Sequence, residues 1–174
     1  METTANNGEA SYHSGASLPA SDSNFGDLLQ LVSFRIGGEE FALDILRVQE
    51  IIRVQQLTRV PNSPDCVDGV INLRGKVIPV IALRKRFGLE QIAHDKQTRI
   101  VVVEVKGAIW GFIVDSVSEV LRIPAHTVEL PPRLNKVDRE YVSGVGKLDD
   151  RLLILLDVDS LLGDFEGSNP LGAA

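Results

Sequence analysis

The sequence contains very few of the residues that build reactive centres. Cys66 is the single cysteine, so neither an internal disulfide nor a cysteine-based metal site can form. The three histidines, His13, His94 and His126, have no spacing typical of metal ligands. The Gly-x-Ser-x-Gly motif of a serine nucleophile is also missing. These absences predict a protein that is not an enzyme and that uses no metal or cofactor.

Basic residues and long apolar runs are scarce as well. Lysine and arginine number 18 against 24 acidic residues, a net charge of −6, and the one basic run is short, at 84–87. A nucleic-acid partner would require a basic stripe, so none is expected. The longest apolar run, 77–83, is far below the roughly 20 residues of a membrane span. With no secretory signal at the N-terminus, we expect a cytoplasmic protein without direct membrane contact.

Both ends of the chain have few large apolar side chains and are rich in small and polar residues. Such segments cannot bury enough apolar surface to offset the entropy lost on ordering. We therefore expect a disordered N-terminal tail over residues 1–29 and a C-terminal tail over 164–174.

Between the tails the chain repeats itself. A shift of 69 positions places Val32 on Val101 and matches several later residues with identical ones, namely Val48 with Val117, Glu50 with Glu119, Arg53 with Arg122 and Thr58 with Thr127. A shift of 75 positions places Gly69 on Gly144 and Leu73 on Leu148. The larger second shift indicates one insertion between the two regions, in the segment 124–141. A repeat of this length is typical of one structural unit present twice.

Both copies have the pattern of short β-strands. Apolar residues alternate at 32, 34 and 36 and at 101, 103 and 105, and a glycine-containing turn follows each set. Five short antiparallel strands that close on themselves leave no open edge. We predict an all-β protein with two five-stranded barrels, 30–88 and 98–163, joined by 89–97, and with short helical turns at 83–87 and 158–162. The residues expected in the core are Phe41, Leu43, Ile45, Trp110, Phe112 and Val114.

One short motif differs between the copies. Residues 72–75 read Asn-Leu-Arg-Gly, whereas the counterpart at 147–150 reads Lys-Leu-Asp-Asp. The fold therefore does not require Arg74, which is expected either to bind a partner or to form a local salt bridge. A phosphate-binding loop is excluded because Gly69 and Gly75 are too far apart and Lys76 is followed by valine. Features that both copies keep, such as Gly69 and Gly144, are expected to be structural.

Four stretches resemble the CheW family of bacterial chemotaxis coupling proteins: 39–52, 58–88, 111–123 and 141–162. The signatures "VQEI" at 48–51 and "NLRG" at 72–75 are the most specific of them. The resemblance implies SH3-like barrels that together form one CheW-like domain over 30–163. It also implies an adaptor that joins the cytoplasmic tips of chemoreceptors to the regulatory domain of the histidine kinase CheA. An adaptor in a non-chemotactic or surface-motility kinase pathway is the alternative.

The same resemblance implies where the receptor binds. The positions are Val48, Glu50, Ile51, Ile100 and Val120, although the sequence also allows Ile100 to be a core residue. Arg74 matches the signature arginine of the family and is expected to anchor the assembly at or beside this groove. Asn72 and Gly75 are expected to shape its turn, and Glu50 to lie close enough to orient it. The sequence identifies no residue that contacts the kinase.

Overall fold

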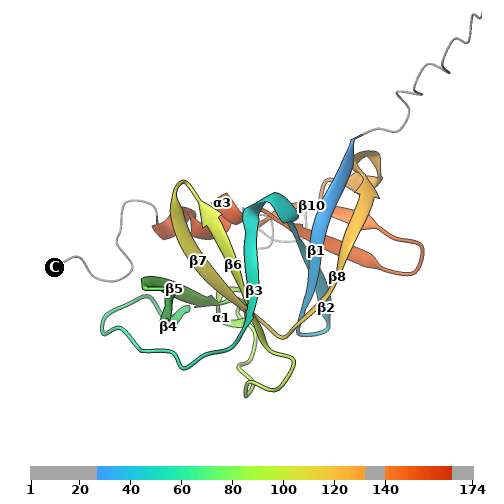
Figure 1. The fold of residues 1–174 in the computed structure, drawn as a ribbon. Coiled ribbons are helices and arrows are strands. Elements are labelled where there is room, and N and C mark those ends of the chain that lie inside the picture. The colour runs from blue at the N-terminus through green and yellow to red at the C-terminus, as the bar shows by residue number, and fades with distance from the viewer. Residues whose placement is uncertain (1–26, 132–139, 166–174) are drawn as a thin grey trace, which may run out of the picture.

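The computed structural model describes residues 27–131 and 140–165, which form two β-sheets of six and five strands (Figure 1). The first half of the chain contains β1 (Leu28–Ile36), β2 (Glu39–Asp44), η1 (Ile45–Arg47), β3 (Val48–Arg53), β4 (Val67–Leu73), β5 (Lys76–Ala82) and α1 (Leu83–Arg86). The second half contains β6 (Arg99–Val105), β7 (Ala108–Val114), β8 (Ser116–Pro124), η2 (Ala125–Thr127), β9 (Val128–Glu129), β10 (Val142–Lys147), β11 (Leu152–Leu156), α3 (Val158–Leu162) and η3 (Gly163–Phe165). The predicted all-β fold with short helical turns is confirmed.

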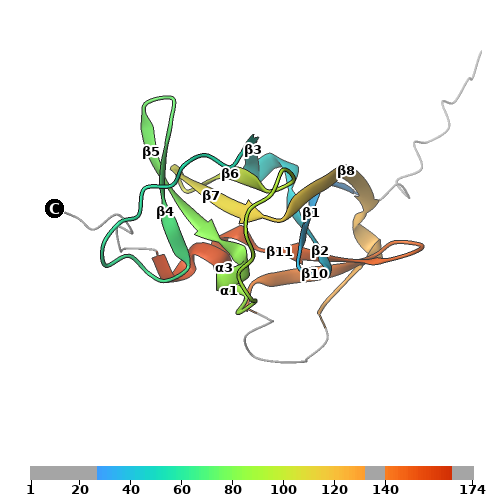
Figure 2. The ribbon, with the colours of Figure 1, turned by 90° about the horizontal axis from the view of Figure 1, so that it is seen from below.

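Each sheet contains strands from both halves of the chain. Sheet A has the order β8-β1-β2-β11-β10-β9, and sheet B has the order β3-β6-β7-β5-β4. Under the internal duplication the first five strands of sheet A correspond one by one to those of sheet B. Each half therefore contributes its first two strands to one sheet and its later strands to the other, as the interleaved colours of Figure 2 show.

This exchange differs from the expected division of the chain at 89–97, which follows the sequence but not the sheets. The reason lies in the links that follow β2 and β7. One link is the single 3-10 turn Ile45–Arg47, and the other is the one residue Asp115. Both links carry the chain straight on into the neighbouring sheet. Asp115 alone is shorter than the two-residue loop of the tightest common hairpin, and residues 45–47 form a 3-10 turn instead of a hairpin turn.

Two glycines confirm the repeat at the level of the backbone. Gly69 and Gly144 each lie at a register shift in the hairpins β4–β5 and β10–β11. A Cβ atom at Gly69 would lie 2.5 Å from the carbonyl oxygen of Thr58, and one at Gly144 would lie 2.5 Å from a methyl group of Val128. Both glycines are therefore structural, as predicted, because neither place has room for a side chain.

Three apolar clusters form the core. The largest combines residues of both sheets, among them Phe34 and Phe41 of sheet A and Trp110 and Phe112 of sheet B. The other two clusters each lie within one sheet. The predicted core residues are buried except Ile45, which is only partly buried because it lies in the 3-10 turn rather than in a strand.

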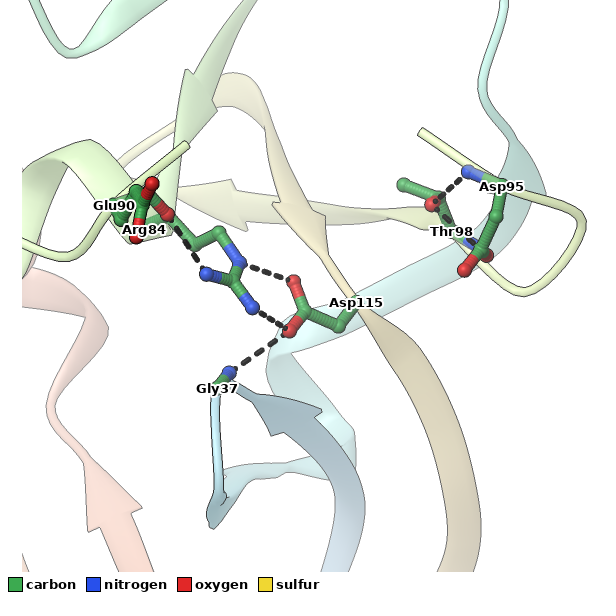
Figure 3. Close-up of polar contacts among 6 residues, drawn as sticks. All are labelled: Gly37, Arg84, Glu90, Asp95, Thr98 and Asp115. Carbon is green, nitrogen blue, oxygen red and sulfur yellow. Dashed lines mark hydrogen bonds and ion pairs between the residues drawn. The ribbon is translucent and has the colours of Figure 1, made fainter. Parts of the chain in front are cut away.

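An ion pair holds the second link between the sheets. Arg84, in α1, donates to both carboxylate oxygens of Asp115 at 2.8 and 2.6 Å, and the backbone N–H of Gly37 adds a third bond of 2.8 Å (Figure 3). Burial by itself raises the pKa of Asp115. The hydrogen bonds from Arg84 and Gly37, together with the charge of Arg84, outweigh burial and hold the pKa of this carboxyl below its usual value.

The first link has a corresponding ion pair with the charges exchanged. Arg47, at the end of η1, donates to a carboxylate oxygen of Asp159 in α3 at 2.9 Å. The aspartate Asp159 occupies the position that Arg84 has in the first half. Each link between the sheets is thus joined by an ion pair to one short helix: the link at Ile45–Arg47 to α3, and Asp115 to α1.

Candidate functional site

Three predicted site residues of the first half, Val48, Glu50 and Ile51, lie on β3, an edge strand of sheet B. β3 pairs with β6, and the register places Val48 opposite Val103, Glu50 opposite Val102 and Ile51 opposite Val101. Directly opposite residues of an antiparallel pair have their side chains on the same face. Because a register shift falls between Val48 and Glu50, Val48 and Ile51 share one face of β3.

That face of β3 adjoins the core between the sheets. Val101 and Val103 are buried members of this core, and Val48 packs against it. Ile51 lies further out, with 39% of its surface exposed. Glu50, by contrast, lies on the other face of the strand. The structure thus divides the predicted β3 residues into an apolar pair on one face and an acidic residue on the other.

Arg74 lies at the tip of the β4–β5 hairpin. Arg74 and Gly75 are the two turn residues, with φ angles of +51° and +82°, and a turn of two left-handed residues suits the twist of a hairpin. The backbone N–H of Gly75 donates to the side-chain oxygen of Asn72 at 2.9 Å. A positive φ is uncommon for an arginine, so the hairpin holds this side chain in an unusual backbone conformation.

The hairpin brings Arg74 to Glu50. Its Nη2 atom donates to Oε2 of Glu50 at 2.7 Å, and 77% of the arginine side chain is exposed against 23% of the glutamate. A guanidinium has five N–H donors, and this ion pair uses one of them. The local salt bridge foreseen for Arg74 is present, and it leaves most of the guanidinium accessible to a partner.

A pocket of about 180 Å³ lies beside this ion pair. Its apolar lining comes from Leu73, Ile78 and Ile109, and its polar lining comes from Gln49, Glu50, Arg74 and Lys76. A pocket lined by both apolar and charged side chains suits a partner side chain that has an apolar stem and a polar end. We refer to these seven residues as the Arg74 pocket.

Ile100 does not belong to the accessible site, and that part of the prediction is wrong. Its exposed surface is 0%, and it packs within sheet B, where a Cβ atom at Gly111 would lie 2.8 Å from its Cγ2 methyl group. The sequence could not decide this point because residues 100–103 are all apolar, so no alternation indicates which side chains face inward.

Val120 lies on β8, the edge strand of sheet A, with 60% of its surface exposed. The register pairs it with Val32, just as Ile51 pairs with Val101, the counterpart of Val32. Val120 and Ile51 are therefore the same position of the repeat. Each leaves an apolar side chain accessible at the edge of a sheet.

Five residues of the Arg74 pocket were not among the predicted site residues: Gln49, Leu73, Lys76, Ile78 and Ile109. The comparison of the two copies contained a signal for one of them. Ile109 corresponds to Glu40, so the copies differ in charge at this position, whereas Lys76 corresponds to Arg151 and the positive charge is kept.

On sheet A the equivalent positions form a closed charge network. Arg151 forms an ion pair with the buried Glu40, with 2.9 Å between Nε and Oε2, and another with Glu119, the counterpart of Glu50. The hydrogen bond to Glu119 and the nearby carboxylates raise the pKa of Arg151 above its usual value. This arginine is therefore held by two carboxylates.

The part of the chain that the structure describes contains no group of three or more histidine, cysteine, aspartate or glutamate side chains that could hold a metal ion. Over the same residues, every helix is too short or too polar to cross a membrane.

Comparison with known proteins identifies the family. The model of the CheW-like domain matches residues 30–166, which include nearly all of the two sheets and the Arg74 pocket. This chain belongs to the CheW-like family. It is 38% identical to the chemotaxis protein CheW of Klebsiella aerogenes, over 79% of this chain and 83% of that protein. It is 40% identical to the chemotaxis protein CheW of Helicobacter pylori, over 78% of this chain and 82% of that protein.

A solved structure agrees with this membership. The crystal structure of the scaffolding protein TtCheW from Thermoanaerobacter tengcongensis matches with a TM-score of 0.73 and 38% sequence identity, over 78% of this chain and 88% of that one. The two SH3-like barrels of the CheW-like fold therefore correspond to sheets A and B, and the Arg74 pocket lies on the barrel that contains sheet B.

Proposed function

We propose that this CheW-like protein is a chemotaxis adaptor that joins the cytoplasmic tip of a chemoreceptor to the regulatory domain of the histidine kinase CheA. Its relatives are named chemotaxis proteins, and the similar solved structure is that of a scaffolding protein. The observation that carries the proposal is Arg74. This exposed cation lies on a left-handed turn beside a pocket, and only one of the two equivalent hairpins has it.

The receptor is proposed to bind along the edge of β3. A receptor tip is a helical hairpin, and a helix can lay an apolar stripe on exposed valine and isoleucine side chains. Val48 and Ile51 provide that surface on one face of the strand. Val120, at the equivalent position of sheet A, provides a second apolar contact. Burying exposed apolar surface contributes roughly 25 cal/mol per Å² before the costs of association are subtracted.

Arg74 anchors the assembly from the other face of the strand. Glu50 holds one end of the guanidinium at 2.7 Å, so part of the ordering cost of this long side chain is met before a partner arrives. The remaining donors can form paired hydrogen bonds with a carboxylate or with backbone carbonyls of the partner. Removing such an anchor typically costs about 2–5 kcal/mol of binding.

The kinase is proposed to bind elsewhere on the molecule. An adaptor has to hold receptor and kinase at the same time, so the two contact surfaces cannot coincide. We assign no residue to the kinase contact.

Arg74→Ala tests the proposal. In an assay of ternary assembly between a receptor cytoplasmic fragment, this protein and CheA, we expect affinity to fall by roughly tenfold or more. Arg74→Lys should be almost as impaired, because a point charge cannot replace the planar fork. Lys106→Ala is the matched control, since Lys106 also lies at the tip of a hairpin with a φ angle of +51°. It should assemble normally.

An Arg74→Ala protein that unfolds at a lower temperature yet still couples kinase to receptor would show that Arg74 only braces the hairpin. In that case the proposed anchor is wrong. If the wild-type protein binds neither receptor fragment nor kinase, the adaptor function itself is wrong.

A further inference from the structure

Two arginines face each other across the end of the β3–β6 pair. The register places Arg53 directly opposite Arg99. Like charges at directly opposite positions destabilise a sheet. In sheet A the equivalent pair, between β8 and β1, is Arg122 opposite Gln30, which contains one charge only. The fold therefore does not require the doubled charge, by the same comparison that identified Arg74.

Among the described residues, no carboxylate neutralises this pair. The side chain of Arg53 is exposed and forms neither an ion pair nor a hydrogen bond with the described residues. Arg99 donates from Nη1 to the backbone oxygens of Lys96 at 2.7 Å and Thr98 at 2.9 Å, which carry no charge. The nearby Asp95 instead accepts bonds from the turn that precedes β6, including one from Thr98 (Figure 3). The chain as a whole carries a net charge of −6, yet no carboxylate among the described residues forms an ion pair with either arginine.

The arginine pair continues the apolar surface of β3. Because side chains alternate along a strand, Arg53 shares its face with Ile51. Beside Arg99 lies a depression of about 250 Å³ lined by Gln97, Arg99, Ser116 and Val117. Val117 packs against the core between the sheets, as Val48 does. The two arginines thus lie at the polar end of the surface on which the receptor helix is proposed to lie.

We propose that Arg53 and Arg99 together bind a carboxylate of the receptor helix that packs on Val48 and Ile51. This inference rests on the proposed function and names the chemistry of the partner. Two guanidinium groups on the same face of a strand pair can surround one carboxylate, and its charge would offset their mutual repulsion.

The spacing suits a helix that runs along the strand. Ile51 and Arg53 are two residues apart, about 6.6 Å along a strand. Residues four apart on a helix are separated by about 6 Å along its axis and share a face. The partner helix should therefore carry an apolar residue and an aspartate or glutamate about one turn apart.

The test uses the full-length protein and a purified cytoplasmic fragment of a chemoreceptor from the same genome as the probe. We expect Arg53→Gln combined with Arg99→Gln to weaken binding of the fragment by roughly five- to tenfold at low salt. The wild-type affinity should fall with added salt more steeply than that of the double variant, because salt screens the ionic contact. Arg122→Gln, which removes one charge at the position equivalent to Arg53 and so matches the single variant Arg53→Gln, should alter affinity by less than about twofold.

A second readout separates binding from folding. Arg53→Gln removes a repulsion and no contact among the described residues, so its Tm should equal or exceed that of the wild type. This single variant also keeps the test decisive if the double variant folds poorly. A binding loss without a loss of Tm is the expected signature.

Three results would overturn the inference. One is an unchanged receptor affinity in the Arg53 and Arg99 variants. Another is an equal loss in Arg122→Gln, which would indicate a general effect of net charge. The third is a loss of affinity for the kinase regulatory domain alone. If Arg74→Ala still impairs receptor assembly in these cases, this inference fails while the proposed function stands.

Discussion

The two halves of the chain place a glutamate at the same position of the repeat and pair it with an arginine in different ways. Arg151 approaches Glu119 from the start of β11 and also forms an ion pair with the buried Glu40, which leaves 34% of the arginine side chain exposed. Arg74 approaches Glu50 from the tip of its hairpin, has that one carboxylate partner, and keeps 77% exposed.

The difference follows from one substitution within the repeat. Where sheet A has Glu40 in β2, sheet B has Ile109 in β7, and Ile109 lines the Arg74 pocket. The same type of barrel therefore supports a closed charge network on sheet A and an open pocket with an available cation on sheet B. A duplicated fold can keep one copy for stability and use the other for recognition.

The largest effect should come from the paired core positions Phe41 and Trp110, which occupy equivalent places in the two halves. Both are buried in the cluster between the sheets. We expect Phe41→Ala and Trp110→Ala each to lower the free energy of unfolding by about 3–5 kcal/mol, measured by urea denaturation. A loss below about 1 kcal/mol for either one would mean that the halves do not share this core equally.

The two links between the sheets should differ in strength. Asp115→Asn removes the negative charge and replaces one of the two oxygens that accept these three hydrogen bonds with an NH2 donor, and we expect a loss of about 1.5–3 kcal/mol at neutral pH. Asp159→Asn weakens one more exposed pair and should cost less than about 1 kcal/mol. Equal losses in thermal or chemical unfolding would contradict this ranking.

The Asp115 contribution should depend on pH. The pKa of Asp115 is lowered in the folded state, so its stabilisation is complete above the unfolded pKa of roughly 3.9. It is lost as the pH falls through the lower folded pKa, because the unfolded chain then binds the additional proton. The stability difference between the wild type and Asp115→Asn should therefore stay constant from neutral pH down to about pH 4 and shrink below it.

Changing Ile109 to Glu should make the pocket on sheet B resemble the charge network on sheet A. A carboxylate at this position would compete for Lys76 and Arg74 and would place negative charge in the pocket. We expect receptor affinity in a titration to fall by roughly fivefold. Ile109→Met, which keeps the apolar lining and a similar volume, is the control and should bind normally. An unchanged affinity of the glutamate variant would remove the pocket from the receptor site.

The smallest effect should be that of Arg74→Ala on thermal stability. Exposed ion pairs contribute little, so its Tm should change by no more than about 2 °C. Arg151→Ala should lower the Tm more, because it leaves the buried Glu40 without its partner. Differential scanning calorimetry of the two variants under identical conditions would compare the halves directly. The reverse ranking would make Arg74 the structural arginine.

Several features were predictable because they depend on local sequence. Alternating apolar residues identified most of the strands. The turn at 72–75 followed from asparagine and glycine, which tolerate left-handed backbone angles. The contrast between "NLRG" and its counterpart singled out Arg74 without any knowledge of its surroundings.

Other features depend on contacts between distant segments, and a local pattern cannot reveal them. Ile100 lies in a continuous apolar run, and its partner strands decide that it faces inward. Glu40 and Arg151 are far apart in the chain, so their ion pair appears only when β2 and β11 become neighbours.

The sequence by itself determined that this protein is a duplicated all-β chain with a distinctive arginine in one copy, because strand periodicity, turn residues and repeats are properties of short segments. Only the tertiary structure decided that each sheet is assembled from both halves and which side of β3 each residue faces. Equivalent segments of a repeat have equivalent pairing patterns. The repeat alone therefore does not show whether a strand pairs with a strand of its own copy or with the equivalent strand of the other copy. That choice depends on the 3-10 turn Ile45–Arg47 and on Asp115, which carry the chain from one sheet into the next.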